Sequence, residues 1–298
     1  MHDDPQQIVY RRFDDFEMLS DTIQGWDLEL FKLESGTFFG EFFQILSPEV
    51  LLTGGFFSSR LRQRGAPPAG YRTFAVSARE PFRMVWRGHQ VTENDLLIFP
   101  PGGELAAFSS PGFSVYTLSV KESMLAEWMN PGVLEGIEVL PCIPRSINRL
   151  RSQLAESRRR SYLNKVSVCG ELARLATDAL PAKSVITRKS RRLQIVLTAE
   201  QHILTHPDEA TTVQELCRKT GVSKRTLEYA FSSHLGITPK RFINSIRLNA
   251  AHKQLCSGTV QKVVDAANTW GFWHMGQFAA DYLKLIGELP SDTLKKVC

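Results

Sequence analysis

A short stretch of this sequence holds the side chains best suited to specific chemistry. Four of them share one face of a predicted helix, opposite its apolar face: Lys224, Arg225, Glu228 and Tyr229. Arginine pairs bidentately with guanine O6 and N7, and glutamate accepts a hydrogen bond from cytosine N4. Lysine binds phosphate, and tyrosine contacts a phosphate or a thymine methyl. This face therefore has the chemistry to read DNA base edges.

The helix that carries these side chains belongs to a motif that occurs twice in the C-terminal third. The first copy runs Val213-x-x-Leu216-Cys217-x-x-x-Gly221, then Leu227-x-x-x-Phe231, then Gly236-x-x-Pro239. The second runs Val263-x-x-Ala266-Ala267-x-x-x-Gly271, then Phe278-x-x-x-Tyr282, then Gly287-x-x-Pro290. The offset is 50 residues up to the first glycine and 51 after it. Two copies of one supersecondary unit are therefore predicted.

Each copy has the parts of a helix-turn-helix. Cys217 and Ala267 are small residues four positions before a glycine, where two helices must cross closely. Gly221 and Gly271 permit the positive φ of the turn between those helices. An αα-hairpin solenoid is the alternative, but solenoids usually need three or more units and only two are present. The pattern favours two helix-turn-helix motifs.

Capping residues mark where the helices begin. Thr212 and Glu215 form a capping-box pattern, and Ser223 is placed to cap the next helix. Thr238 followed by a proline predicts a third helix that reaches Leu255. That helix has about 17 residues, or ~25 Å. It is a rigid spacer of the length needed to hold two recognition helices in successive major grooves, which lie ~34 Å apart.

This combination of two copies, a connecting helix and Gly-x-x-Pro ends resembles the AraC/XylS family of bacterial transcription regulators. Three runs also resemble the branch that contains the ethanolamine-operon regulator: Val222-Ser223-Lys224-Arg225-Thr226-Leu227, Ile246-Arg247-Leu248-Asn249-Ala250 and Trp270-Gly271-Phe272-Trp273-His274-Met275-Gly276-Gln277-Phe278. The resemblance implies a seven-helix DNA-binding domain in which the second helix of each motif enters the major groove. It further implies a sequence-specific regulator that is not an enzyme, activates a nearby promoter and contacts RNA polymerase. Repression stays open as the alternative.

The predicted DNA contacts follow from the two recognition helices. They are Ser223, Lys224, Arg225, Thr226, Glu228 and Tyr229 in the first motif and His274 and Gln277 in the second. Arg225 occupies the position where the family resemblance implies base reading, so it is predicted to be the main base reader, and a surface salt bridge is its structural alternative. The outward positions of the second helix carry no Lys or Arg before Lys284. We therefore expect the first helix to supply most of the base specificity, and the second to dock mainly by shape and backbone contacts.

Two further features near these helices have a structural and a functional interpretation. Trp270, Phe272 and Trp273 cluster beside the second turn, where aromatic residues are core in most duplex readers and stack on nucleic acid in few. Arg247 resembles a position that the family keeps for internal packing, and phosphate binding is its weaker interpretation. We expect packing in both cases.

The N-terminal part has a different pattern. Short apolar runs alternate with turn signals and predict strands within Thr37–Leu46, Val50–Phe57, Tyr71–Val76, Phe82–Trp86, Asp95–Phe99 and Phe113–Val120. The stretch 88–102 resembles the strand–turn–strand of a cupin-type barrel. Residues 147–180 have helical periodicity. The predicted fold class is α+β, with an N-terminal cupin-like β-barrel and dimerisation helices, and a C-terminal all-α domain with two helix-turn-helix motifs.

The family resemblance assigns sensing and dimerisation to such an N-terminal domain. Its helices carry an apolar stripe that a lone domain would bury elsewhere, which predicts a homodimer: Leu150, Leu154, Leu163, Val166, Leu172 and Leu175. An effector pocket, if there is one, would be lined by barrel aromatics, which could equally be core: Phe43, Phe82, Trp86 and Tyr116. The sequence identifies no effector, and an assembly role without sensing stays open.

The alternative function is a cupin-type metalloenzyme or small-molecule-binding protein fused to a DNA-binding module. Metal cupins use convergent His and Glu ligands, whereas His89 stands alone with Glu93 and Glu104. His202 and His206 are four residues apart on a helix but lack a third ligand. No phosphate-loop, dinucleotide or nucleophile-elbow motif is present. We therefore expect no enzyme activity, no cofactor and no metal.

The distribution of charge also separates the C-terminal third, which carries the repeated motif, from the rest of the chain. Residues 188–298 hold 16 Lys and Arg against 9 Asp and Glu, whereas residues 1–187 hold 20 against 22. The excess positive charge suits contact with phosphate, although a solvated basic face would look the same. We expect a domain at 1–180, a linker at 181–190 and a DNA-binding domain at 191–298. Five scattered cysteines, no apolar leader and no membrane span predict a cytoplasmic protein, nucleoid-associated when bound to DNA.

Overall fold

The computed structural model describes residues 6–16, 23–80, 82–87, 89–179, 191–206 and 211–296. The chain divides into two compact units. Unit 1 comprises residues 1–29, 39–58 and 63–188, and unit 2 comprises Leu30–Phe38, Ser59–Arg62 and Lys189–Cys298. The predicted linker at 181–190 lies outside the described residues. Two short N-terminal segments thus fold with the C-terminal third, an arrangement that was not predicted from the sequence.

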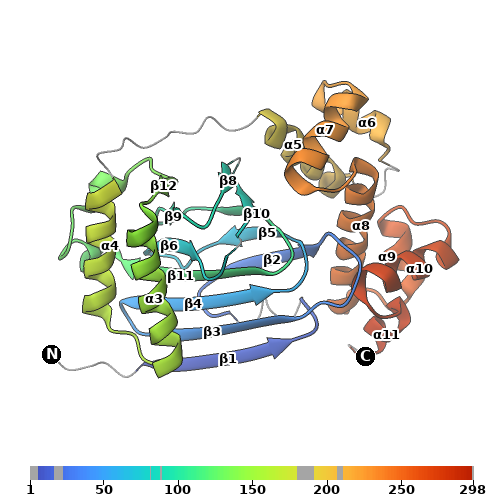
Figure 1. Cartoon of the computed structure of the whole chain (residues 1–298). Coiled ribbons are helices and arrows are strands. Elements are labelled where there is room, and N and C mark those ends of the chain that lie inside the picture. The colour runs from blue at the N-terminus through green and yellow to red at the C-terminus, as the bar shows by residue number, and fades with distance from the viewer. Residues whose placement is uncertain are drawn as a thin grey trace. The chain divides into compact units, whose positions relative to one another are not determined.

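Unit 1 contains a seven-stranded antiparallel sheet (Figure 1). Its strands, in spatial order, are β1 (Gln7–Phe13), β3 (Gly40–Leu46), β4 (Val50–Phe57), β11 (Phe113–Lys121), β6 (Tyr71–Ser77), β9 (Asp95–Phe99) and β12 (Val139–Pro141). β11 lies at the centre, where Tyr116 is opposite Gly54 on one side and Val76 on the other. The apolar residues of one face form the main core of the unit.

A second sheet has five strands. In spatial order they are β2 (Asp27–Lys32), β5 (Leu61–Ala66), β10 (Leu105–Ser109), β7 (Met84–Trp86) and β8 (His89–Val91). Among the described residues, each sheet ends in edge strands and neither closes on itself. The predicted sheet-rich N-terminal part is confirmed, and its described strands form two open sheets. The sequence missed β1, β2, β5, β10 and β12, which are short or interrupted by charged residues that obscure an alternating apolar pattern.

The helices of unit 1 cover the core face of the seven-stranded sheet (Figure 1). They are α2 (Glu122–Leu125), the 3-10 helix η1 (Pro131–Leu134), α3 (Pro144–Arg160) and α4 (Lys165–Ala179). The region predicted as one helical stretch is interrupted after α3, where Ser161 adopts a left-handed conformation with φ of 52°. Of the predicted apolar stripe, only Val166 is exposed. The other five leucines pack into the unit's own core, so the stripe does not call for a partner.

Unit 2 has seven helices in its described residues (Figure 1). They are α5 (Arg191–Thr205), α6 (Val213–Thr220), α7 (Lys224–Leu235), α8 (Pro239–Cys256), α9 (Val263–Thr269), α10 (Met275–Ile286) and α11 (Pro290–Lys295). The number agrees with the family resemblance. α8 runs between the two predicted motifs and begins at the predicted proline. No helix in the described parts of the chain combines the length and apolarity needed to cross a membrane.

Candidate nucleic-acid interface

The first helix-turn-helix consists of α6, the turn at Gly221 and α7. Gly221 has φ of 67°, the left-handed conformation that the turn requires. Ser223 caps α7, because its Oγ accepts a hydrogen bond from the Thr226 backbone N–H at 3.2 Å. Leu227 and Phe231 are fully buried, and the Phe231 ring lies 5.1 Å from that of Phe242 in α8. These contacts fix which face of α7 turns outward.

The outward face of α7 carries the predicted reading residues. Lys224, Arg225, Glu228 and Tyr229 are all exposed. Lys224 Nζ lies 3.9 Å from Glu228 Oε1, a loose pair that leaves both groups accessible. Arg225 has no ion pair or hydrogen bond to any residue that the structure describes. Its guanidinium is therefore presented to solvent with its five donors available.

Tyr229 has a neighbour that the sequence did not reveal. The residue is 54% exposed, and the guanidinium carbon of Arg192 lies 4.5 Å from the centroid of its ring. Arg192 comes from the first turn of α5, far from α7 in sequence. This cation–π contact adds a positive charge from α5 to those of Lys224 and Arg225 on the face of α7. Only the packing of α5 against α7 brings the two residues together.

The second helix-turn-helix repeats this frame with α9, the turn at Gly271 and α10. Gly271 has φ of 74°. Phe278 and Tyr282 are buried, and the Phe278 ring lies 5.0 Å from the ring of Phe272. Tyr282 Oη lies 2.6 Å from His252 Nδ1 of α8, which anchors α10 to the connecting helix. The repeat seen in the sequence therefore corresponds to two equivalent packing arrangements.

The outward face of α10 differs from that of α7. His274 is the N-cap residue, but its side chain makes no capping hydrogen bond. Gln277 is exposed, and its Nε2 donates to Asp281 Oδ1 at 2.9 Å. Trp270 and Phe272 pack against the core as expected, whereas Trp273 is 64% exposed. The second motif thus presents the amide of Gln277 on α10 and the indole of Trp273 in the turn before it, whereas the first presents two cations.

Arg247 is buried in α8, in agreement with the packing interpretation. Burial lowers the pKa of its guanidinium, and Glu215 opposes that shift. The guanidinium lies beside Gly271: a Cβ at that glycine would be 3.5 Å from the Arg247 guanidinium carbon. The arginine therefore fills the space next to the second turn and is not available to a phosphate.

The two N-terminal segments of unit 2 make buried polar contacts with its helices. Asn249 of α8 clamps the backbone of Lys32: its Oδ1 accepts from Lys32 N–H at 2.7 Å and its Nδ2 donates to Lys32 O at 2.8 Å. Arg62 forms a bidentate pair with Glu200 of α5, both distances being 2.8 Å, and both side chains are buried. No motif in the sequence marks these long-range contacts.

The same segments reach the C-terminal ends of both recognition helices. Arg60 Nη1 donates to the carbonyl of Leu235, the last residue of α7, at 2.6 Å. A cation at a helix C-terminus is favourable because the helix dipole is negative there. The backbone N–H of Gly36 donates to Lys284 O in α10 at 3.4 Å. Segments 30–38 and 59–62 therefore help to hold both motifs in place.

The residues considered for metal binding do not converge. His89 Nε2 lies 3.6 Å from Glu138, which also pairs with Arg87. The His202 and His206 rings lie 4.5 Å apart. Within the described ranges, no group of three or more His, Cys, Asp or Glu side chains is arranged to hold a metal ion.

Comparison with known proteins agrees with this geometry. Residues 216–296 match the family model described as a helix-turn-helix domain. A 105-residue stretch is 36% identical to the probable thc operon regulatory protein of Rhodococcus erythropolis, covering 35% of this chain and 32% of that protein. A 90-residue stretch is 34% identical to the XylDLEGF operon transcriptional activator 3 of Pseudomonas putida, covering 30% of this chain and 27% of that protein. The C-terminal part of the chain belongs to the AraC/XylS family of DNA-binding regulators.

A solved structure from the same family is also similar. It is a probable AraC family transcriptional regulator from Rhodopseudomonas palustris CGA009, 34% identical, with a TM-score of 0.33, covering 35% of this chain and 97% of that one. The chain spans about a third or less of the length of these two curated relatives. The family model covers residues 216–296, all of which belong to unit 2.

Proposed function

We propose that this protein is a sequence-specific transcription regulator, acting as an activator, with Arg225 as its main base reader. The observation that carries the proposal is the exposed Arg225 on the outward face of α7, without a partner in the described residues, inside an AraC-type domain. The similarity to a P. putida operon activator supports activation over repression.

The proposed DNA contacts are the predicted set on the two recognition helices: Ser223, Lys224, Arg225, Thr226, Glu228, Tyr229, His274 and Gln277. α8 has 18 residues, and such a rod is of the length needed to hold two motifs over adjacent major grooves of one duplex. Residues 191–298 would form the DNA-binding domain, 181–190 a linker, and 1–180 a sensing and dimerising domain. The Arg192–Tyr229 contact adds positive charge where α7 would meet phosphates.

The test is selection of binding sites by the full chain from a random duplex library. Arg225→Ala should relax the preference at one base position and cost about 1–3 kcal/mol of binding free energy. Lys224→Ala is the matched control: it should weaken binding evenly across sequences and reduce the salt slope by about one. If Arg225→Ala selects the same motif with the same affinity, Arg225 is not the base reader.

The remaining partners follow from the same proposal. Activation requires contact with RNA polymerase, and a bacterial regulator acts in the cytoplasm, associated with the nucleoid when bound. Homodimerisation follows from the family resemblance, and the exposed Ile143, Tyr162 and Val166 of unit 1 offer apolar area for it. Sedimentation at micromolar concentration tests this point, and a monomer there would contradict it.

A further inference from the structure

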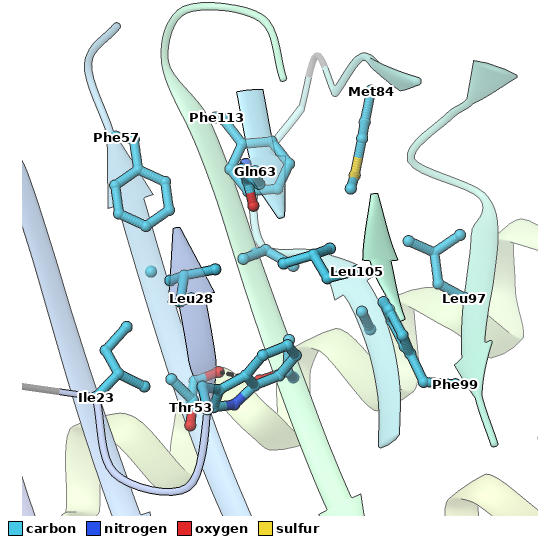
Figure 2. Close-up of a pocket in the computed structure, with 15 residues that line it drawn as sticks. Ile23, Leu28, Thr53, Phe57, Gln63, Met84, Leu97, Phe99, Leu105 and Phe113 are labelled. Carbon is cyan, nitrogen blue, oxygen red and sulfur yellow. Dashed lines mark hydrogen bonds between the residues drawn. The ribbon is translucent and has the colours of Figure 1, made fainter. Parts of the chain in front are cut away.

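Side-chain amides occupy different settings in the two units. In unit 1, Gln63 and Met84 are among the side chains that line a cavity without charged walls (Figure 2). None of the aromatic residues predicted for an effector pocket lines this cavity: Phe43, Phe82, Trp86 and Tyr116. In unit 2, Gln277 is exposed on α10 and is bonded to another polar side chain. Gln277 is therefore the amide that a large partner such as DNA can reach.

Gln277 lies in the first turn of α10 and is held by Asp281, one turn further along the same helix. Gln277 Nε2 donates to Asp281 Oδ1 at 2.9 Å. Asp281 is half-buried, and its other oxygen, Oδ2, accepts a longer hydrogen bond from Asn244 Nδ2 at 3.4 Å. Asn244 belongs to α8, the helix between the two motifs. The Asp281 carboxylate is therefore bonded to the connecting helix on one side and to the outward amide on the other.

The carboxylate decides which way round the Gln277 amide lies. An ionised carboxylate accepts hydrogen bonds and has none to donate, whereas an amide has a donating NH2 end and an accepting carbonyl end. The NH2 end must therefore face Asp281, as it does. Turning the amide over would lose this hydrogen bond and would place Oε1 against a carboxylate oxygen, which repels it. The carbonyl oxygen and one N–H of Gln277 are left for an outside partner.

The residues beside Gln277 leave its amide prominent. Gly276 and Ala280 are exposed, and their side chains are too short to reach past it. A Cβ at Gly276 would meet no described atom within 4 Å, so the space next to Gln277 is open. Between Met275 and Leu283, all of which the structure describes, Gln277 is the only exposed polar side chain. Base readout by this part of α10 therefore depends on the Gln277 amide.

The orientation of the amide selects a kind of group in the major groove. Adenine and cytosine present donors there, the amino groups at N6 and N4, whereas guanine and thymine present the keto oxygens O6 and O4 as acceptors. A carbonyl oxygen that is held outward pairs with an amino group and not with a keto oxygen. A glutamine without a partner such as Asp281 has no fixed orientation and meets either kind of group.

We propose that Asp281 is a positioning residue that turns the Gln277 carbonyl toward DNA, so that the second motif selects one base pair by its amino group. This inference rests on the proposed DNA-binding function and adds to it the group that Gln277 reads and the residue that orients it. Every base pair carries an amino group on one strand and a keto oxygen on the other. A selected motif alone therefore does not reveal which group is read, but chemically altered bases do.

The first measurement identifies the group that is read. Selection from a random duplex library by the full chain and by Gln277→Ala locates the base pair, as the position whose preference the variant loses. Removing the amino group of that pair, with purine for adenine or 2-pyrimidinone for cytosine, should weaken binding by the wild-type chain about three- to fivefold, the strength of one hydrogen bond. Removing the keto oxygen of the same pair should not.

Gln277→Ala is the control for the altered bases, because it reports any effect of weakened base pairing itself. Its Kd should be the same for the natural fragment and for the fragment without the amino group. The proposal is overturned if Gln277→Ala selects an unchanged motif, if the wild-type chain tolerates loss of the amino group, or if loss of the keto oxygen costs as much.

The second measurement tests the role of Asp281. Asp281→Asn keeps the shape of the side chain but offers Gln277 either end of an amide, so the penalty for losing the amino group should fall below about twofold. Asp265→Asn is the matched control, since it removes the same charge from an exposed position in α9 and should keep the full penalty. A purely structural role of Asp281 would change the affinity for both fragments alike.

A full penalty in Asp281→Asn therefore overturns the positioning role. The altered bases still identify the group that wild-type Gln277 reads, whatever the stability of this variant. Failure of the wild-type chain to prefer any sequence would instead contradict the proposed function. A selected motif that responds to the wrong group would contradict this inference alone.

Discussion

In the first helix-turn-helix copy, α7 exposes Lys224 and Arg225. In the second, α10 exposes Gln277 and has no Lys or Arg before Lys284, and the exposed Trp273 lies in the turn before the helix. The helices and turns of the two copies agree closely. Both recognition helices have twelve residues, and each is followed by a glycine in the left-handed conformation and then by a helix that begins with proline. The repeat therefore preserves the packing of each motif and not its surface. This difference teaches that a repeat in sequence predicts how the helices pack. The surface that each copy could present to DNA depends on its own outward-facing residues.

The capping of the two helices differs as well. Ser223 caps α7 with a side-chain hydrogen bond, and His274 provides none for α10. α10 is held instead by the buried Tyr282, whose hydroxyl lies 2.8 Å from Thr293 Oγ1 and 2.6 Å from His252 Nδ1. The first copy thus relies on a local cap, and the second on contacts between helices.

The largest loss of stability should come from the buried aromatic residues that the two copies share. Phe231→Ala and Phe278→Ala each remove a buried ring, so each should lower the free energy of unfolding by about 3–5 kcal/mol. Urea denaturation measures both. A loss at one position and not at the other would show that the two copies are not equivalent in packing.

The next test concerns Lys32, whose backbone is bound by Asn249 of α8, the helix that connects the two copies. Burial lowers the pKa of Lys32 to about 8, and the charge of Glu34 opposes that shift. The folded state therefore disfavours the protonated amine relative to the unfolded chain, whose lysine pKa is about 10.5. Stability should rise as pH increases from about 8 to about 10.5.

Lys32→Met should remove this dependence and stabilise the protein near pH 7 by about 2–3 kcal/mol, after allowance for the lost hydrogen bond to Gly36. Urea denaturation at pH 7 and pH 9.5 measures it. Because Asn249 of α8 binds the Lys32 backbone, which Met retains, both copies should still unfold in one transition. Two separate transitions would show that α8 does not join them.

The difference in surface predicts unequal effects on DNA binding. Arg225→Ala should cost about 1–3 kcal/mol, whereas Gln277→Ala should cost less than about 1 kcal/mol, since its amide already bonds to Asp281. Fluorescence anisotropy at fixed salt measures both. A larger loss of binding free energy for Gln277→Ala than for Arg225→Ala would contradict the proposal that α7 contributes more to DNA binding than α10.

The smallest effects should come from the caps. Ser223→Ala should destabilise the protein by about 1 kcal/mol. His274→Ser should stabilise it by about 0.5–1 kcal/mol, because it supplies a cap that α10 lacks. Thermal unfolding of both variants, with His274→Ala as the control for loss of the imidazole, distinguishes capping from other roles of the histidine.

Much of unit 2 could be predicted because its signals are local. Glycines at positive φ, capping residues and apolar spacing act within a few residues, and Ser223, Gly221 and Pro239 each have the predicted structural role. The exposed face of α7 follows from the same spacing. Unit 1 was predicted less well, because a short strand such as β5 is defined by its partners across the sheet and has little pattern of its own.

The sequence by itself determined the two motifs, the helix between them and the residues presented by each recognition helix, since helical periodicity and turn chemistry are local properties. Only the tertiary structure decided that the stripe of α3 and α4 is buried within its own unit, and that Arg192 meets Tyr229. It also decided that Lys32 and Arg62 fold with the C-terminal helices. Those pairings join residues far apart along the chain, and the free energy of such contacts depends on packing that no short window of sequence encodes.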